Sequence, residues 1–267
     1  RAVADSVDPL LLIDIRHASV DGGALLIVEV PFTPRPFYIR SEGFPDGVYV
    51  REGSTNTRAD ESTVQELQRQ AAAVSYDLET VPSIDAKDLD ARRLRTAFGR
   101  KPTVAKLKTL GLADDQAGRS VATRAGVILF GADEQRRRHH PDARIRAAAF
   151  KGTTMVDFLD QGSEFDGTTV LEALDLVDTF IERNTREGAS IGGALRRINI
   201  REYAPRALRE LLVNAVAHSN YASAGTPISV ALFSDRPEIS SPGRSPPGTT
   251  VGSRKAGLSK MRNRGLT

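Results

Sequence analysis

The chain has 267 residues, of which 40% are hydrophobic, and this is enough for one large domain or two domains of ordinary size. It contains no cysteine, which excludes disulfides, thiolate metal sites and a cysteine nucleophile. The formal net charge is only +3, and seven of the 37 basic residues are lysine, so the arginine-rich composition is read either as solvated surface arginine or as a nucleic-acid-binding surface.

The first elements of the chain are expected to form a small antiparallel sheet. Strand-forming runs at residues 10–15 and 24–30 flank the turn sequence "DGG" at 21–23, which predicts a hairpin. Two further short strands are expected at residues 37–40 and 48–51. The apolar runs are far shorter than the ~20 residues that cross a bilayer, and nothing in these residues resembles a secretory segment. We therefore expect a cytoplasmic protein.

A helix is expected to close this first unit. Ser62 and Gln65 have the spacing of a capping box, and apolar residues recur at helical spacing, which predicts a helix over residues 62–74. The following segment "VPSIDAKDLD", residues 81–90, is expected to be a linker.

Two short helices are expected after this linker. Asp88 or Asp90 is positioned to cap the first helix, and the second, in "TVAKLKTLGL", should end at Gly111. We interpret the pair, joined by the turn "FGRKPT", as a helical connector. A DNA-binding helix-turn-helix is the alternative.

The pattern changes at residue 125. The short apolar run "AGVILFG", residues 125–131, is typical of a strand buried on both faces, and residues 143–152 alternate like a neighbouring strand. Between these runs, "RRRHH" at 136–140 is expected to be an exposed loop. A helix is expected over residues 168–185, with one apolar stripe formed by Leu171, Leu174, Val177, Phe180 and Ile181.

The last part of the chain combines strands with one more helix. Strands are expected at residues 194–200, 227–234 and 237–240, and a helix begins near Pro205. The buried face of this helix is expected to consist of Leu208, Leu211, Leu212 and Ala215.

The same helix carries a line of polar residues. Glu210, Asn214 and His218 are each four residues apart, so they share one edge of the helix. One reading is a solvent-exposed edge. The other is a carboxylate that activates water beside an amide oxygen that binds Mg²⁺, as a triphosphate site requires.

The order of motifs resembles that of a known family. The "E-x-x-x-N-x-x-x-H" helix, the strands "ISVALFSDR" and "PEIS", and the turn "SPGRSPPG" resemble the ATP-binding module of the GHKL superfamily, which includes gyrase and histidine kinases. More specifically, the chain resembles bacterial transcriptional regulators with a Schlafen-type AlbA-like DNA-binding domain, often labelled RecG-like helicases. The further blocks that carry this resemblance are "GVYVREGSTNTRAD" at 47–60, "ATRAGVILFG" at 122–131, "PDARIRAAAFKGT" at 141–153 and "GLSKMRN" at 257–263.

The resemblance implies an α+β fold in three parts. Residues 1–75 would be the C-terminal part of an AlbA-like antiparallel α/β domain, and residues 76–120 a helical connector. Residues 121–267 would be a GHKL-like α/β sandwich, a mixed sheet covered by helices, that stops before its second glycine-rich box. We expect the chain to be part of a longer protein.

The resemblance also implies roles for single residues. Glu210 would be the general base, Asn214 a Mg²⁺ ligand, and His218 would face phosphate. Ser241 and Gly243 would lie at adenine, where ATP-hydrolysing members carry an aspartate in place of Ser241. A hydroxyl lacks the charge that strengthens that hydrogen bond.

These implications lead to three functional hypotheses. The first is a DNA-binding regulator whose degenerate ATP-binding domain serves as a ligand sensor or a scaffold for a homodimer, with Arg40, Arg51 and Arg58 as candidate nucleic-acid contacts. The second is an active Mg²⁺-dependent ATPase, and the third a self-association core that binds no nucleotide. The chain has no P-loop, which argues against a helicase motor. The expected ligands are ATP with Mg²⁺ and DNA, with no membrane partner.

Overall fold

The structure is a computed structural model of the chain. It describes residues 5–20, 23–30, 33, 35–52, 54–72, 74–165, 167–185, 187–192, 196–201, 203–223, 225–243, 262–263 and 265–266. The described chain divides into two compact units, and the division falls between Val74 and Ser75.

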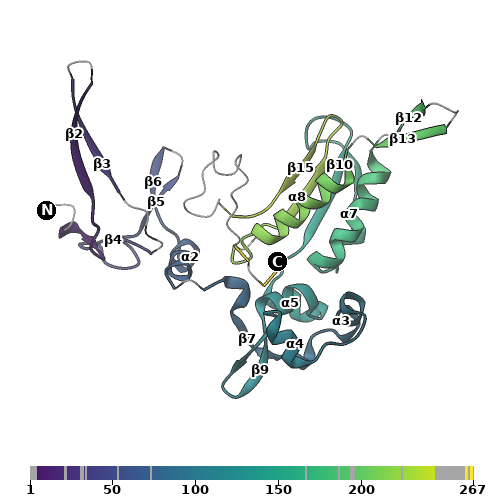
Figure 1. The fold of residues 1–267 in the computed structure, drawn as a ribbon, viewed down its shortest axis with the longest axis horizontal. Coiled ribbons are helices and arrows are strands. Elements are labelled where there is room, and N and C mark those ends of the chain that lie inside the picture. Colours follow the sequence, from purple (N-terminus) through teal and green to yellow (C-terminus); the bar gives the residue numbers. More distant parts are fainter. Residues whose placement is uncertain are drawn as a thin grey trace. The chain divides into compact units, whose positions relative to one another are not determined.

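Within its described residues, the first unit contains three antiparallel strand pairs and the helix α2 (Figure 1). The pairs are β1 (Val7–Asp8) with β4 (Tyr38–Ile39), β2 (Asp14–Val20) with β3 (Gly23–Glu29), and β5 (Tyr49–Glu52) with β6 (Thr55–Arg58). The predicted hairpin is thus confirmed, although its first strand begins at Asp14 and not at residue 10. The predicted single sheet is wrong. The turn residues 21 and 22 lie outside the described residues.

Few apolar side chains of the first unit are buried. Within its described residues, Val48 and Val64 are the buried hydrophobic side chains. The β2–β3 hairpin instead exposes large aliphatic residues: Ile15, Val20, Leu25, Leu26, Ile27 and Val28.

Helix α2 (Glu61–Ala71) closes this unit, but the predicted capping box does not form. Asp60 is the N-cap, and its carboxylate accepts a hydrogen bond from the backbone N–H of Thr63 at 2.7 Å. Ser62 lies inside the helix and donates to the same carboxylate. An aspartate two residues earlier therefore displaces the serine as the cap.

The second unit begins with a small sheet and two helices. Its elements are the 3-10 turns Tyr76–Leu78 and Ala86–Asp88, β7 (Thr80–Asp85), α3 (Ala91–Phe98), α4 (Val104–Thr109), β8 (Ala113–Gln116) and β9 (Arg119–Thr123). The strands form an antiparallel sheet in the order β7-β9-β8. The predicted linker at 81–90 is thus largely a strand, because Val81 and Ile84 are buried in a core shared with both helices. Asp90 caps α3, and Gly111 follows α4 with φ +69°, as predicted.

Two predictions between residues 124 and 140 are wrong. The run 125–131 is not a strand but helix α5 (Arg124–Phe130), whose N-cap Thr123 accepts a hydrogen bond from the N–H of Gly126. A short run that is apolar on every side fits a buried helix as well as a buried strand. The expected loop at 136–140 is mostly helix α6 (Asp133–His139), and Arg136 and His140 are buried.

The main sheet has four strands in the order β11-β10-β14-β15. The strands are β10 (Ile145–Phe150), β11 (Phe158–Gln161), β14 (Ile228–Leu232) and β15 (Pro237–Ser240); β10 and β14 are parallel, and the outer pairs are antiparallel. The 3-10 turn Ser163–Phe165 follows β11, and the hairpin β12 (Glu187–Gly192) and β13 (Arg196–Arg201) follows α7.

Two helices cover one face of this sheet. Helices α7 (Val170–Asn184) and α8 (Pro205–His218) lie side by side, and both pack on alternate residues of β10 and β14 such as Ile145 and Val230 (Figure 1). The predicted buried stripes are largely confirmed, but Leu171 and Leu211 are 38% and 54% exposed. The mixed sheet with its helices confirms the predicted α+β class and is consistent with a GHKL-like fold. None of the described helices is long and apolar enough to cross a membrane.

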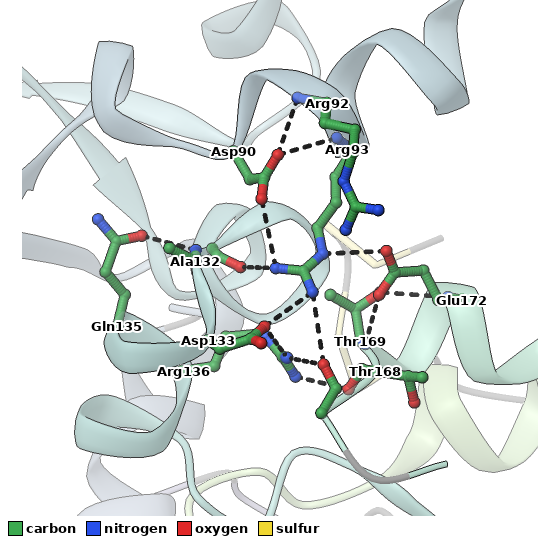
Figure 2. A network of polar contacts seen from close by, with 12 residues as sticks. Asp90, Arg92, Arg93, Ala132, Asp133, Gln135, Arg136, Thr168, Thr169 and Glu172 are labelled. Carbon is green, nitrogen blue, oxygen red and sulfur yellow. Dashed lines mark hydrogen bonds and ion pairs between the residues drawn. The ribbon is translucent and has the colours of Figure 1, made fainter. Parts of the chain in front are cut away.

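A buried network of two arginines joins α3, α6 and the start of α7 (Figure 2). Arg93 of α3 donates to Asp133 Oδ1 at 2.8 Å, to Glu172 Oε1 at 3.0 Å and to the carbonyl of Gly131 at 2.7 Å. Arg136 shares Asp133 and also donates to the carbonyl of Thr168. The carboxylates therefore hold the small-sheet part of the unit against the main-sheet part.

Candidate functional site

Helix α8 supplies the candidate site. It begins with Pro205 at its first turn, where the missing N–H costs nothing. Leu208, Leu212 and Ala215 are buried between α7 and the sheet. This anchoring holds the opposite edge of the helix in a defined position.

The predicted polar line lies on that outer edge. Glu210 and Asn214 are exposed, and His218 is partly buried near the end of the helix. Each step of four residues advances about 6 Å along the helix axis. Leu211 and Val213, which are 54% and 44% exposed, stand beside the polar residues. The outer surface therefore offers a carboxylate, an amide and aliphatic side chains together.

The turn that contains Ser241 lies at the C-terminal end of the same helix. The backbone N–H of Asn220 donates to the carbonyl of Pro242 at 2.8 Å. Gly243 has φ +106°, and a Cβ there would come within 2.7 Å of Asn220 Cβ. A glycine is thus required by the backbone and by this close approach.

Asn263 fastens the end of α8. Its side-chain Nδ2 donates to the carbonyls of Ala217 and Ser219 at 2.9 and 2.8 Å, and its own side chain is fully buried. The block that contains Asn263 was recognised from sequence only by its resemblance. Its role as a cap depends on contacts 44 and 46 residues away in the chain.

A small pocket of about 140 Å³ lies next to the turn. Its lining includes Tyr76, His140, Asn220, Tyr221 and Pro242. Burial lowers the pKa of His140 to about 3, so its imidazole is neutral at physiological pH. Neither ring nitrogen has a hydrogen-bond partner among the described residues.

The sequence analysis missed this buried histidine because the residues next to it in the sequence are basic or polar. "RRRHH" has the composition of a solvated loop, and only the tertiary packing of residues 139–143 against the loop after α8 buries the ring of His140. The apolar pattern gave no signal at this position. Arg136, in the same run, is buried by the network of Figure 2.

The three candidate nucleic-acid arginines all lie in the first unit and have polar partners. Arg40 is 3.5 Å from Asp8, and Arg58 is 3.2 Å from Glu42. Arg51 donates to Asn56 at 3.1 Å. Because Arg58 pairs across the strands with Tyr49, and Tyr49 and Arg51 are two residues apart, Arg51 and Arg58 share one face of the β5–β6 hairpin.

Two other kinds of site fail on the described geometry. Within the described ranges, no group of three or more His, Asp or Glu side chains could hold a metal ion by itself. Residues 188–192, "GASIG", have the Gly-x-Ser-x-Gly spacing of a hydrolase nucleophile. They run inside strand β12, whereas a nucleophile elbow requires a strand-to-helix turn.

Comparisons with known proteins agree with this class of fold. Residues 225–267 match the family described as "Putative ATP-dependent DNA helicase recG C-terminal". The match covers less than half of the chain, and it is a similarity to a RecG C-terminal, GHKL-type domain over these residues alone. It supports that part of the resemblance.

One solved structure is similar over almost the whole chain. The DIP2311 protein from Corynebacterium diphtheriae superposes with a TM-score of 0.57 at 20% sequence identity, over 99% of this chain and 51% of that one. The likeness shows a shared fold, and this chain spans about half the length of that protein. No curated protein matches the sequence.

Proposed function

We propose that this chain belongs to a DNA-binding regulator in which the second unit binds ATP with Mg²⁺ as a signal. The observation that carries the proposal is the position of the turn Ser241–Gly243 at the C-terminal end of α8, the helix that carries Glu210 and Asn214 on its exposed edge. A base at the turn and phosphates along the helix would occupy one continuous strip. The match to the RecG C-terminal family includes the turn, but not α8, and supports a nucleotide-binding class of domain.

Each residue of the strip has a defined task in the proposal. The amide oxygen of Asn214 contributes one ligand to Mg²⁺, whose other ligands are phosphate oxygens and water, as is usual for this ion. His218 faces phosphate near the end of the helix. The hydroxyl of Ser241 accepts a hydrogen bond from the adenine amino group, and Gly243 keeps the turn close to Asn220.

The residues favour sensing over hydrolysis. Ser241 offers a neutral acceptor, which holds a base less strongly than a carboxylate does. Glu210 is exposed and has the chemistry of a general base that could orient a water molecule. An active ATPase is therefore the second candidate function, and it depends on the same helix edge.

Titration calorimetry with ATP, in the presence and absence of MgCl₂, tests the proposal. Asn214→Ala should abolish the Mg²⁺-dependent part of binding, whereas Arg206→Gln, an exposed change on the same helix, should leave it intact. Steady phosphate release that disappears in Glu210→Gln would establish the ATPase instead. No heat with any nucleotide would refute the nucleotide role and leave a scaffold, which light scattering would show as a stable dimer.

DNA binding is proposed for the first unit on separate grounds. Arg51 and Arg58 share a hairpin face, and Arg40 follows β4 in the same unit. The surface ion pairs of Arg40 and Arg58 are worth little, so phosphates can replace their carboxylate partners. The variant Arg51→Gln/Arg58→Gln should weaken the anisotropy change of a labelled duplex. Binding that is unchanged by this variant would refute the assignment.

A further inference from the structure

Residues 80–123 have the arrangement of a helix-turn-helix with a β-hairpin behind it. Strand β7 is followed by α3 and α4, and the hairpin β8–β9 returns to pair with β7. Leu94 of α3 and Leu107 of α4 are buried in one core with these strands. This is the chain order of a winged helix-turn-helix, a scaffold on which the second helix contacts DNA.

The turn between the helices is well defined. Helix α3 ends at Phe98, and Gly99 follows in a left-handed conformation with φ +72°. Helix α4 begins after Thr103, whose hydroxyl accepts a hydrogen bond from the N–H of Lys106 at 3.2 Å. The five residues between the two helices therefore have a defined backbone conformation.

Five exposed cations lie on α3, on the turn and on α4, and they form no ion pair with any described residue. Arg93 of α3 is buried against carboxylates, but its neighbours on the outer face are not. Within the described part of the chain, no ion pair is formed by Arg92, Arg95, Arg100, Lys101 or Lys106. We call these five residues the α3–α4 patch.

The chemistry around the patch favours nucleic acid. Exposed positive charge that is not held in ion pairs is suited to a regular array of phosphates. Thr96 and Thr103 are exposed polar side chains among these cations, and Phe98, at the end of α3, is 38% exposed. The hairpin fits less well, because its strand β8 carries Asp114 and Asp115, although Asp115 is paired with Lys108.

We propose that the α3–α4 patch binds the phosphate backbone of double-stranded DNA. The contact is made by α3, the turn and α4, and not by the hairpin tip. It is a second DNA contact, in a different unit from Arg40, Arg51 and Arg58, and it does not require nucleotide binding at α8.

The test is the salt dependence of duplex binding by the full chain. Arg95→Gln/Lys106→Gln should weaken binding roughly tenfold and lower the slope of log K against log[NaCl] by about 2, since each lost phosphate contact removes about 0.9. The turn variant Arg100→Gln/Lys101→Gln should weaken binding and lower the slope by similar amounts. Arg137→Gln/Arg138→Gln, an equal charge change at two exposed positions of α6, is the control and should leave the slope unchanged.

Three outcomes overturn the proposal. The first is an unchanged slope in both patch variants, and the second is an equal loss in the α6 control, which would indicate a general charge effect. The third is loss of binding to phosphatidylserine vesicles with DNA binding retained, which would assign the patch to a membrane. In the first outcome, weaker DNA binding by Arg51→Gln/Arg58→Gln would leave the first unit as the DNA contact. Equal melting temperatures by circular dichroism show that the variants are folded.

Discussion

Replacing Arg93 with methionine should destabilise the second unit by about 3 kcal/mol. The Arg93 side chain is 6% exposed, and its guanidinium donates to Asp133, Glu172 and the carbonyl of Gly131. Methionine keeps much of the aliphatic volume but satisfies none of these acceptors. The loss therefore comes from the polar groups that remain (Figure 2).

The size of this loss in stability depends on how exposed the three hydrogen-bond acceptors of Arg93 are. The carbonyl of Gly131 is buried and would lose this charged donor, at a cost of about 1–3 kcal/mol. Removing one partner of a fully buried ion pair costs about 3–5 kcal/mol. Asp133 and Glu172 are 46% and 35% exposed, so water compensates them in part. Arg136 also continues to hold Asp133.

Urea unfolding followed by circular dichroism at pH 7 is the assay. Arg95→Met is the matched control, because Arg95 is exposed two residues along the same helix, and it should change stability by less than about 0.5 kcal/mol. A loss below about 1 kcal/mol for Arg93→Met, or equal losses for both variants, would refute the reasoning.

The pH dependence provides a second check. Hydrogen bonds from Arg136 and then Arg93 lower the pKa of Asp133. Burial by itself raises the pKa of Glu172, but hydrogen bonds from Thr169 and Arg93 bring it below its usual value. Carboxyl groups with a lowered folded-state pKa stabilise the fold above their unfolded pKa, and this stability is lost as the pH falls through the folded pKa. The difference between wild type and Arg93→Met should therefore shrink below about pH 4.

Three further predictions concern packing, titration and the end of α8. Gly126→Ala should cost about 2–4 kcal/mol in urea unfolding, since its Cβ would come within 2.1 Å of the carbonyl of Leu112, while Gly152→Ala, with open space around it, should be neutral. Burial lowers the folded-state pKa of His140 to about 3, so between pH 7 and pH 5 only the unfolded state gains a proton on this residue. The free energy of unfolding of the wild type should therefore fall by about 2 kcal/mol more than that of His140→Leu over this range. Equal losses would contradict the buried neutral ring. Asn263→Asp should lower the melting temperature more than Asn263→Ala, because a carboxylate would face two carbonyl oxygens; the reverse order would contradict the donor geometry.

Local pattern was sufficient for the long amphipathic elements. Helices α7 and α8 and strands β14 and β15 were predicted close to their observed bounds, because each buries one regular face. Short segments were less predictable. The run 125–131 is apolar all round, and the hydrogen bond from Gly126 to Thr123, rather than any periodicity, marks it as a helix.

The predicted site residues differ in how far the structure brings them together. Glu210 and Asn214 share an exposed edge, as four-residue spacing on a helix demands. That the turn at Ser241 meets the end of this helix depends on the hydrogen bond between Asn220 and Pro242, which spans two strands of the sheet. No local pattern encodes that contact.

The sequence by itself determined the polar edge of α8 and the absence of a P-loop, because both depend only on residue identity and spacing within a few turns. The tertiary structure alone decided which charged side chains are buried and which are exposed and available to a ligand. Arg93 and Arg95 stand two residues apart, yet Arg93 meets carboxylates 40 and 79 residues away while Arg95 faces outward. The reason is physical: ion pairing and burial are set by the atoms that packing brings near, and these come from distant parts of the chain.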